Sequence, residues 1–291
     1  MKINSETRLL GLLGSPSKHS LSPVIQNFFI RHYGLNCVYL SFEPDPEDLD
    51  SAFFGARDLD FIGLNVTMPF KDRIYNLVDS TEGPASVFKA VNTVKFLKVG
   101  KLSTGFSTDG EGVIKTLEDR GFDWEDKNCL IIGAGGAAKS AVFSISKKPV
   151  NTINVYDIEV QKTITLINMI GEDDKIKAIK DINKVNSSIY KSIDLVMNCT
   201  PVGMNGGNGI SPALPIPGHW NLKGKTVFEM AYKPVVTDFL KKALSDGALT
   251  VINGIEMLIN QAAFSFKIWF DILPEENVIK SIKEKILKLW N

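Results

Sequence analysis

Short apolar runs alternate with segments of helical periodicity along most of the chain, a pattern typical of an α/β fold with largely parallel sheets. In the first part of the chain we expect strands at residues 9–13, 37–42, 63–66 and 90–96. The apolar positions between them predict helices at residues 23–33 and 46–54. These elements make up a first structural unit.

A second unit of the same kind begins after Thr108. We expect a helix at residues 110–120 and strands at residues 129–132, 152–156, 195–198 and 226–229, with a glycine-rich turn and a helix after the first of these strands. The last segment, residues 277–290, places one apolar stripe on a helical face, made of Val278, Ile279, Ile282, Ile286 and Leu289. We expect this stripe to dock on a domain core; a helix lying on a membrane surface is the alternative.

The composition limits what the protein binds. A chain of 291 residues with 44% hydrophobic residues is long enough for about two domains. Lys plus Arg and Asp plus Glu number 33 each, so no net charge attracts nucleic acid or an anionic membrane. The apolar run at residues 9–13 is too short for a signal peptide, and no run approaches the roughly 18 residues of a membrane span. We therefore expect a soluble protein with no nucleic-acid or membrane partner.

The three cysteines, Cys37, Cys129 and Cys199, are widely separated and form no CxxC pair. This spacing argues against a disulfide scaffold and against a thiolate zinc site. We expect each cysteine to be a small buried apolar residue, in a protein that works in the reducing cytoplasm and holds no metal.

The strand at residues 129–132 runs directly into a glycine-rich segment, Gly133-Ala134-Gly135-Gly136-Ala137-Ala138, which has the pattern GxGxxA. Glycines let the backbone turn tightly and approach a pyrophosphate, whose charge the N-terminus of the following helix stabilises. The next strand is followed by Asp157, about 24 residues after Gly133, near the position of the acidic residue that binds the adenosine ribose in dinucleotide folds. The segment predicts a dinucleotide site; a tight turn with no ligand is the alternative.

Polar clusters follow the strands of the first unit. Ser20 and Ser22 come after the first strand, where Pro23 at the first helical position makes Ser22 a natural N-cap. Two hydroxyls at a helix start suit a carboxylate, although a cap alone also explains Ser22. Lys71 follows the third strand, at the end where open α/β sheets bind ligands; a solvated surface lysine is the alternative. Further polar residues after strand-like runs are Asn65, Thr67, Asn92, Thr93, Ser107, Thr108 and Asp109.

Eight short motifs occur in the order seen in the shikimate dehydrogenase family, which the chain resembles over nearly its whole length. The motifs are HSLSP, NVTMPFK, VNT, TDG, GAGGAAK, NCTPVGM, EMAYKP and GIEMLINQ. Each motif alone is modest evidence for the family, but all eight in this order are specific to it. The resemblance implies the reversible, NAD- or NADP-dependent reduction of 3-dehydroshikimate to shikimate, a step towards chorismate and the aromatic amino acids.

The resemblance also implies roles for particular residues. Lys71 and Asp109 would be the catalytic pair, which takes the hydroxyl proton as hydride moves to the nicotinamide and returns it in the reverse reaction. Lys71 would alternatively stabilise a developing alkoxide. Ser20 and Ser22 would bind the substrate carboxylate. The residues that would bind the ring hydroxyls or close the substrate pocket are Asn65, Thr67, Asn92, Gln261 and Tyr232. Those that would contact the cofactor are Gly133, Ala134, Gly135, Gly136, Ala137, Asp157, Thr200, Pro201, Val202, Met230, Gly254 and Met257.

By the same resemblance, the fold would be a two-domain α/β fold with an inserted Rossmann domain. Residues 1–109 and 254–291 would form the N-terminal α/β substrate-binding and catalytic domain, and residues 110–253 the dinucleotide-binding domain. The partner would be the small-molecule substrate, shikimate or 3-dehydroshikimate. The protein would be a monomer or a homodimer, and the sequence does not choose between them.

Two departures from the family pattern change these expectations. Glu229 stands where the family often has Asp, at a strand end where we expect a structural role. The Asn-Arg-Thr segment that commonly binds the NADP phosphate is Tyr156-Asp157-Ile158 here, and Gln161 replaces a second arginine. Asp157 therefore predicts a preference for NAD over NADP. A quinate/shikimate dehydrogenase of broader substrate range is the alternative enzyme. A nucleotide sensor without catalysis is a further alternative. The presence of both Lys71 and Asp109 argues against it.

Overall fold

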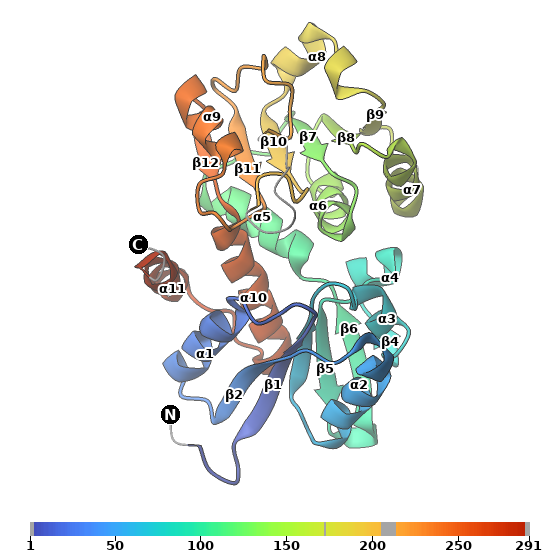
Figure 1. Cartoon of the computed structure of the whole chain (residues 1–291), viewed down its shortest axis with the longest axis vertical. Coiled ribbons are helices and arrows are strands. Elements are labelled where there is room, and N and C mark those ends of the chain that lie inside the picture. The colour runs from blue at the N-terminus through green and yellow to red at the C-terminus, as the bar shows by residue number, and fades with distance from the viewer. Residues whose placement is uncertain (1–2, 172, 205–213, 289–291) are drawn as a thin grey trace. The chain divides into compact units, whose positions relative to one another are not determined.

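The computed structural model describes residues 3–171, 173–204 and 214–288 (Figure 1). The chain divides into two compact units, Met1–Gly112 with Leu258–Asn291, and Val113–Met257. The first unit is thus built from two segments that are distant in sequence, and helices α5 (Asp109–Asp119) and α10 (Gly254–Phe270) each contain a boundary between units. None of the helices in the described residues is both long and apolar enough to cross a bilayer.

The first unit contains a mixed sheet in the order β2-β1-β3-β5-β6-β4. Its strands are β1 (Arg8–Leu13), β2 (Cys37–Phe42), β3 (Gly63–Val66), β4 (Ser80–Thr81), β5 (Thr93–Leu97) and β6 (Leu102–Phe106). Its other elements are α1 (Ser22–His32), η1 (Pro46–Asp48), α2 (Leu49–Asp58), α3 (Lys71–Tyr75), α4 (Pro84–Phe88), η2 (Val99–Lys101) and α11 (Glu276–Lys288), together with most of α10. The expected strand at residues 90–96 begins only at Thr93.

Strand β5 is antiparallel to β3 and β6, which corrects the expectation of a largely parallel sheet in this unit. The reason is the short connection between β5 and β6, in which Gly100 and Lys101 have φ of 75° and 51°. A tight hairpin connection of this kind can join only antiparallel strands, whereas a parallel pair requires a long crossover.

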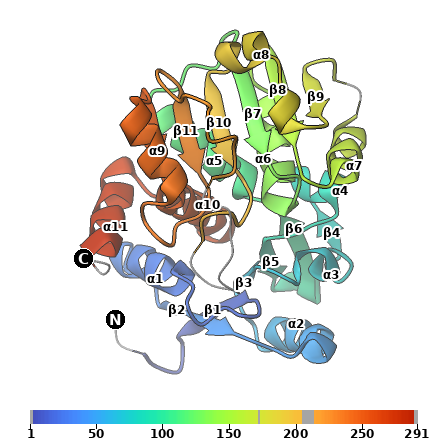
Figure 2. The ribbon, with the colours of Figure 1, turned by 45° about the horizontal axis from the view of Figure 1, so that its top comes forward.

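Helices cover both faces of the first sheet. On one face, α2 and α3 pack on alternate strand residues such as Leu64 and Val94. On the other face, α10 packs beside α1 (Figures 1 and 2). Trp269 of α10 donates a hydrogen bond to the Val94 carbonyl at 2.8 Å, and Phe266 lies 5.6 Å from Phe29 of α1, ring centre to ring centre. Residues of α10 therefore complete the hydrophobic core that α1 and the first sheet begin.

Helix α11 docks on the same unit. Val278, Ile282 and Ile286 are buried and Ile279 is partly buried, so the apolar stripe predicted from the sequence faces protein. Lys285 lies over the ring of Phe28 in α1, 5.8 Å from its centre. Leu289 and Trp290, which we placed in this helix, lie outside the described residues.

The second unit is a parallel sheet in the order β12-β11-β10-β7-β8-β9, the strand order of a doubly wound dinucleotide-binding fold. Its strands are β7 (Asn128–Ile132), β8 (Thr152–Tyr156), β9 (Ile176–Ile179), β10 (Leu195–Asn198), β11 (Thr226–Glu229) and β12 (Thr250–Ile252). Its other elements are most of α5 with α6 (Gly136–Ser146), α7 (Val160–Ile170), η3 (Ile182–Lys184), α8 (Ser187–Ser192) and α9 (Asp238–Asp246).

Two apolar cores cover this sheet, one on each face. Cys129 and Ile131 of β7 point to the core that includes α6, and Leu130 and Ile132 point to the core that includes α9. Strands buried on both faces read as continuous apolar runs, which explains why the sequence showed them clearly. Cys37 and Cys129 are buried, Cys199 is partly buried, and all three are free thiols.

Candidate functional site

Lys71 and Asp109 form an ion pair in the first unit. Lys71 is the first residue of α3, just after β3, and Asp109 is the first residue of α5, just after β6. Lys71 Nζ donates to Asp109 Oδ2 at 2.7 Å, and the two side chains are 25% and 12% exposed. Residues distant in sequence are therefore brought together at the ends of β3 and β6, which are separated in the sheet by β5, and part of each side chain is open to a ligand.

Asn92 fixes the position of Asp109. Its Nδ2 donates to Asp109 Oδ1 at 2.7 Å and to Thr108 Oγ1 at 3.1 Å, while its Oδ1 accepts from the Thr108 N–H at 2.9 Å. The backbone N–H of Val91 donates to the Lys71 carbonyl at 3.0 Å. Each Asp109 oxygen thus has its own donor, and a carboxylate bound this way is held in one orientation.

A buried polar network lies beside this pair. Asn65 Nδ2 contacts Thr93 Oγ1 at 3.1 Å and Ser265 Oγ at 3.0 Å, and Asn65 Oδ1 accepts from the Tyr39 hydroxyl at 2.9 Å. Ser265 Oγ also lies 3.3 Å from Thr108 Oγ1. The network connects the predicted residue Asn65 to the segment that carries Asp109.

Gln261, predicted to bind a ring hydroxyl, reaches the same network from α10. Its Oε1 accepts from Thr108 Oγ1 at 3.4 Å and its Nε2 donates to the Leu258 carbonyl at 2.9 Å. A side chain at Gly112 would put its Cβ 2.8 Å from Gln261 Cβ, so glycine at position 112 is required for α5 to approach α10 this closely. Ser265 and Tyr39 were not predicted as site residues, because a serine or tyrosine among apolar residues gives no signal of its own.

Ser20 and Ser22 lie together at the start of α1, their hydroxyls 3.1 Å apart. The prediction that Ser22 is the N-cap is wrong: α1 begins at Ser22, and Leu21, already helical in its backbone angles, precedes it. The Ser20 hydroxyl instead accepts the Ser22 N–H at 3.2 Å. Ser22 is buried and hydrogen-bonds to Tyr39, whose pKa is raised well above its ordinary value by burial, with the Ser22 bond acting in the opposite direction.

Thr67, the remaining predicted substrate residue of the first unit, follows β3 and is partly buried. Its N–H donates to the Leu13 carbonyl at 2.9 Å, which holds the segment at the carboxyl end of β1. Hydrogen bonds connect five of the predicted residues, directly or through Thr108 and Thr93: Asn65, Lys71, Asn92, Asp109 and Gln261. Ser22 is connected to Asn65 through Tyr39.

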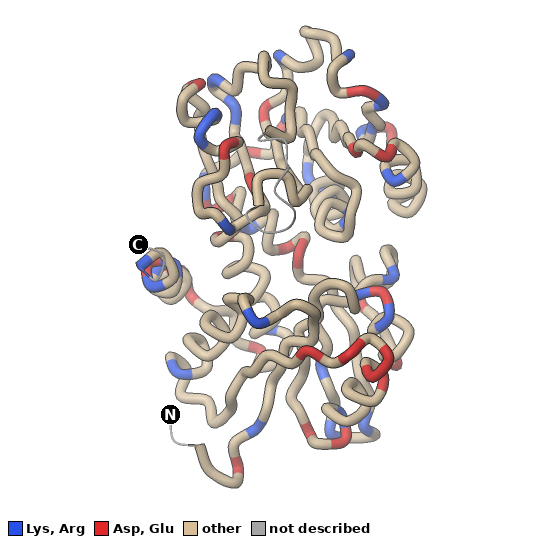
Figure 3. The backbone as a smooth tube through the Cα atoms, viewed as in Figure 1, with Lys and Arg blue, Asp and Glu red and all other residues tan. Residues whose placement is uncertain are grey.

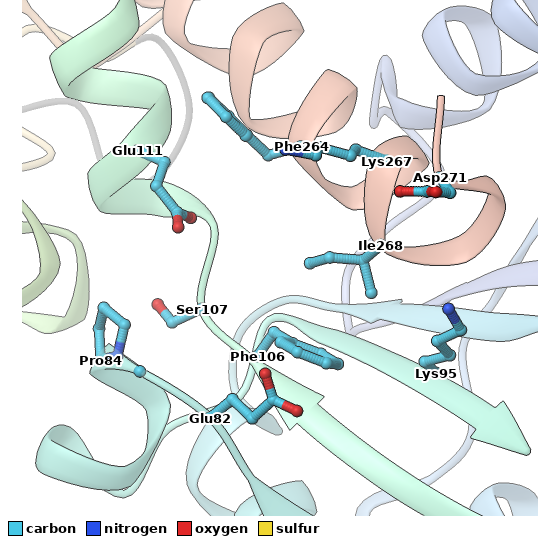
Figure 4. Close-up of a pocket in the computed structure, with 11 residues that line it drawn as sticks. Glu82, Pro84, Lys95, Phe106, Ser107, Glu111, Phe264, Lys267, Ile268 and Asp271 are labelled. Atoms are coloured by element: carbon cyan, nitrogen blue, oxygen red, sulfur yellow. The ribbon is translucent and has the colours of Figure 1, made fainter. Parts of the chain in front are cut away.

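A cavity of about 640 Å³ in the first unit is lined by none of the residues to which the family resemblance gives a role (Figure 4). Its lining comes from α10, the strands β5 and β6, and the starts of α4 and α5. Ser107 and Glu111 point into it from either side of the Thr108–Asp109 segment (Figure 4). Burial raises the pKa of Glu111, and the positive charge of Lys267 opposes the shift.

In the second unit, the glycine-rich turn connects β7 to α6. Gly133 has φ of 104°, a conformation that favours glycine, and a Cβ there would lie 3.0 Å from Thr200 Cγ2. Helix α6 begins at Gly136, and Gly135 precedes it in extended conformation. Gly135 and Gly136 are exposed, with open space where a Cβ would be. The turn therefore leaves a helix N-terminus accessible, as a pyrophosphate requires.

Asp157 lies at the end of β8 and supports this turn. Its Oδ2 accepts from the Ala134 N–H at 2.8 Å and its Oδ1 from the Glu159 N–H at 2.9 Å. A cavity of about 490 Å³ lies against the turn. Its lining residues are Gly133, Ala134, Gly135, Lys139, Asp157, Glu159, Gln161, Lys162, Thr165, Cys199, Thr200 and Pro201. Ala137, also predicted here, is the second residue of α6 and is partly buried.

The other predicted cofactor residues occupy the carboxyl end of this sheet. Thr200 and Pro201 line the cavity, and Val202 follows them in the same loop. Gly254 lies so close to Met230 that a Cβ would be 2.0 Å from its carbonyl oxygen. Met257 is buried in the core of the second unit, with Met230 packed against it. Tyr232 is partly buried, and burial raises its pKa.

The doubly wound second unit with its glycine-rich turn, and the Lys71–Asp109 pair of the first unit, are typical of a dinucleotide-dependent dehydrogenase. Comparison with known proteins identifies the family. Residues 12–94 match the shikimate dehydrogenase substrate binding domain, and residues 254–281 match the shikimate 5'-dehydrogenase C-terminal domain. The chain belongs to the shikimate dehydrogenase family.

Full-length relatives support this assignment. The chain is 38% identical to a shikimate dehydrogenase (NADP(+)) of Methanococcus maripaludis strain C7, over 98% of this chain and 99% of the relative. It is 35% identical to one of Methanocaldococcus jannaschii, over 98% of this chain and all of the relative (100%).

Solved structures agree with the sequence comparisons. A shikimate 5-dehydrogenase of Listeria monocytogenes in complex with shikimate and NAD is 29% identical, with a TM-score of 0.86 over 98% of both chains. A quinate dehydrogenase of Corynebacterium glutamicum in complex with NAD is 25% identical, with a TM-score of 0.86 over 97% of this chain and 99% of that one.

Proposed function

We propose that the protein catalyses the reversible NAD(P)-dependent interconversion of 3-dehydroshikimate and shikimate. The observation that carries the proposal is the Lys71–Asp109 pair, held by Asn92 and partly open to a ligand, in a chain of this family. The residues proposed for the substrate are Ser20, Ser22, Asn65, Thr67, Asn92 and Gln261, and we propose that the first unit binds it.

In the proposed reaction, Lys71 and Asp109 handle the proton. When the 3-keto group is reduced, Lys71 donates a proton to the oxygen or stabilises its developing negative charge; in the reverse direction the pair accepts the hydroxyl proton. Asp109 Oδ2, 2.7 Å from Lys71 Nζ, holds the ammonium group in position and partly compensates its positive charge.

The second unit is proposed to bind the dinucleotide, which supplies or accepts hydride at its nicotinamide ring. The exposed glycines 135 and 136 and the cavity of about 490 Å³ fit a pyrophosphate at the start of α6. Asp157 lines the same cavity and is proposed to bind the adenosine ribose. The three free cysteines support the proposal that the protein works in the reducing cytoplasm.

A quinate/shikimate dehydrogenase of broader range is the second candidate. The similarity to a quinate dehydrogenase that binds NAD and the presence of Asp157 both favour it. Initial rates with shikimate and quinate, each with NAD and NADP, separate the candidates. Turnover of shikimate alone supports the first, comparable turnover of both supports the second, and absence of turnover in all four assays contradicts both.

A further inference from the structure

Glu229, the last residue of β11, has a fully buried side chain (0% exposed) that accepts hydrogen bonds from three neutral groups. Its Oε1 accepts from Asn198 Nδ2 at 2.9 Å and from the Ala231 N–H at 3.1 Å. Its Oε2 accepts from the same Nδ2 at 3.1 Å and from the Thr237 hydroxyl at 3.1 Å. The carboxylate therefore joins the end of β10, the segment after β11 and the start of α9.

The carboxylate determines how the Asn198 amide is oriented. Glu229, when ionised, only accepts hydrogen bonds, so the Asn198 Nδ2 must face it and Oδ1 must face the other way. That Oδ1 accepts from the Thr200 N–H at 3.0 Å and from the Thr200 hydroxyl at 2.7 Å. Asn198 Nδ2 also donates to the Val202 carbonyl at 3.2 Å. Asn198, oriented by Glu229, thus holds the backbone of the loop that follows β10.

This loop forms one wall of the nucleotide cavity. Cys199, Thr200 and Pro201 line it together with the glycine-rich turn. The loop and the turn are in close contact, because a Cβ at Gly133 would lie 3.0 Å from Thr200 Cγ2. Displacement of the loop would therefore change the shape of the cavity at Gly133.

We propose that Glu229 is a positioning residue for the cofactor: through Asn198 it holds the loop of residues 199–202 in the conformation that receives the dinucleotide. The proposal rests on the nucleotide-binding function proposed for this unit. It gives Glu229 a role in affinity for the cofactor, beyond the structural role expected of a residue at a strand end.

Protonation provides a way to observe this role. Burial raises the pKa of Glu229 to about 7, and the hydrogen bonds from Asn198, Ala231 and Thr237 act in the opposite direction. A proton on Oε1 faces two N–H donors, those of Asn198 and Ala231. A proton on Oε2 faces the Asn198 donor or is donated to the Thr237 hydroxyl, which then no longer donates to Glu229. Cys199, the other titratable group at this place, has its pKa raised by burial and by the Glu229 charge, so it stays protonated at neutral pH. Affinity for the cofactor should then fall as pH falls through about 7.

The main test is Glu229→Gln, which keeps the shape but places an NH₂ group against Asn198 Nδ2, Ala231 N or Thr237 Oγ1. We expect the Kd for NADH and NADPH, measured by fluorescence titration, to rise roughly tenfold, which corresponds to about 1.4 kcal/mol. The KM for shikimate at saturating cofactor should change much less. The wild-type Kd should increase below about pH 7, and the variant should lose this dependence.

A double-mutant cycle tests whether Glu229 acts through Asn198. Asn198→Ala should weaken nucleotide binding by itself, and Glu229→Gln should add little in that background, because residues that act as a unit are not additive. Asp246→Asn is the control. Asp246 is a carboxylate of the same unit that accepts the Leu222 N–H at 2.9 Å and does not line the nucleotide cavity, so its replacement should lower the unfolding temperature and leave the Kd unchanged.

Different failures of this experiment have different meanings. Wild-type protein that binds nucleotide but turns over no substrate contradicts the proposed function alone. An unchanged Kd in Glu229→Gln, a wild-type Kd that does not respond to pH near 7, or fully additive effects of Glu229→Gln and Asn198→Ala would overturn the positioning role. If Glu229→Gln does not fold, Asn198→Ala keeps the test open, because the proposal requires the Kd to rise in that variant as well.

Discussion

Replacing Asp157 should change which cofactor the protein uses. Asp157 lies at the end of β8 and lines the nucleotide cavity, at the position where the family commonly has the arginine that binds the NADP phosphate. We therefore expect the wild type to prefer NAD, although relatives such as that of Methanococcus maripaludis are named for NADP. Asp157→Asn should shift the preference towards NADP.

The magnitude follows from the charges at the cavity. A 2′-phosphate brings about −1.5 to −2 charges, and each pair of unit charges at ~5 Å with an effective dielectric of ~20 costs about 3 kcal/mol. Two lysines, Lys139 and Lys162, line the cavity. Lys162 is already bound to Glu159 at 2.5 Å, and the side chains of this pair are both more than half exposed. Even if salt and relaxation halve the repulsion, a preference of roughly tenfold or more remains.

The assay is kcat/KM for NAD and for NADP at saturating shikimate. The ratio is the informative quantity, because Asp157 also accepts hydrogen bonds from the Ala134 and Glu159 N–H groups, so its replacement can weaken both cofactors. Asp123→Asn is the matched control, since Asp123 accepts the Glu125 N–H in the same local arrangement but does not line the cavity. A wild-type ratio that favours NADP would refute the reasoning, and an unchanged ratio in Asp157→Asn would show that Asp157 is not the cause.

Two further predictions concern the first unit. Lys71→Ala should lower kcat by at least ~10²-fold with a much smaller change in the KM for shikimate, because it removes the group that handles the proton; initial rates check this, and near-normal turnover would exclude the role. Ser20→Ala and Ser22→Ala should each raise the KM for shikimate by the loss of a hydrogen bond to a carboxylate, worth about 1.5 to 3 kcal/mol. Both variants should also lose ~1 kcal/mol of stability in thermal unfolding, because the Ser20 hydroxyl accepts the Ser22 N–H and the buried Ser22 hydroxyl hydrogen-bonds to Tyr39. Unchanged KM values in two stable variants would place the carboxylate elsewhere.

The elements predicted best from the sequence are the buried strands. The strands β3, β8, β10 and β11 have the predicted bounds, because a strand covered on both faces is largely apolar. The edge strand β2 also has the predicted bounds, although Leu40 is exposed, because its sequence, CVYLSF, is apolar except for Ser41. The strands β6, β9 and β12 were not predicted. β6 has the sequence LSTGF, β9 carries an exposed lysine, Lys177, and β12 has three residues, so none gives a continuous apolar signal.

The residue types of the candidate site could be predicted from the sequence, but their arrangement in space could not. Lys71 and Asp109 each follow a strand and Asn92 directly precedes one, and the sequence shows which residue types stand there. That they meet depends on β5 lying between β3 and β6, a consequence of the antiparallel hairpin that the sequence analysis did not contain. Whether Ser20 or Ser22 accepts the first helical N–H depends on one residue's backbone angles, which proline alone does not determine.

The two-segment construction of the first unit has a consequence for the order in which the protein folds during its synthesis. Phe29 and Val94 emerge from the ribosome early, but their partners Phe266 and Trp269 follow only after the whole second unit. At ~5–20 residues per second, that interval is about 10 to 30 s. The second unit is continuous in sequence and can complete its core in this time. The first part of the chain to be made is thus the last to gain its full hydrophobic core, with one face of its sheet exposed to chaperones until α10 arrives.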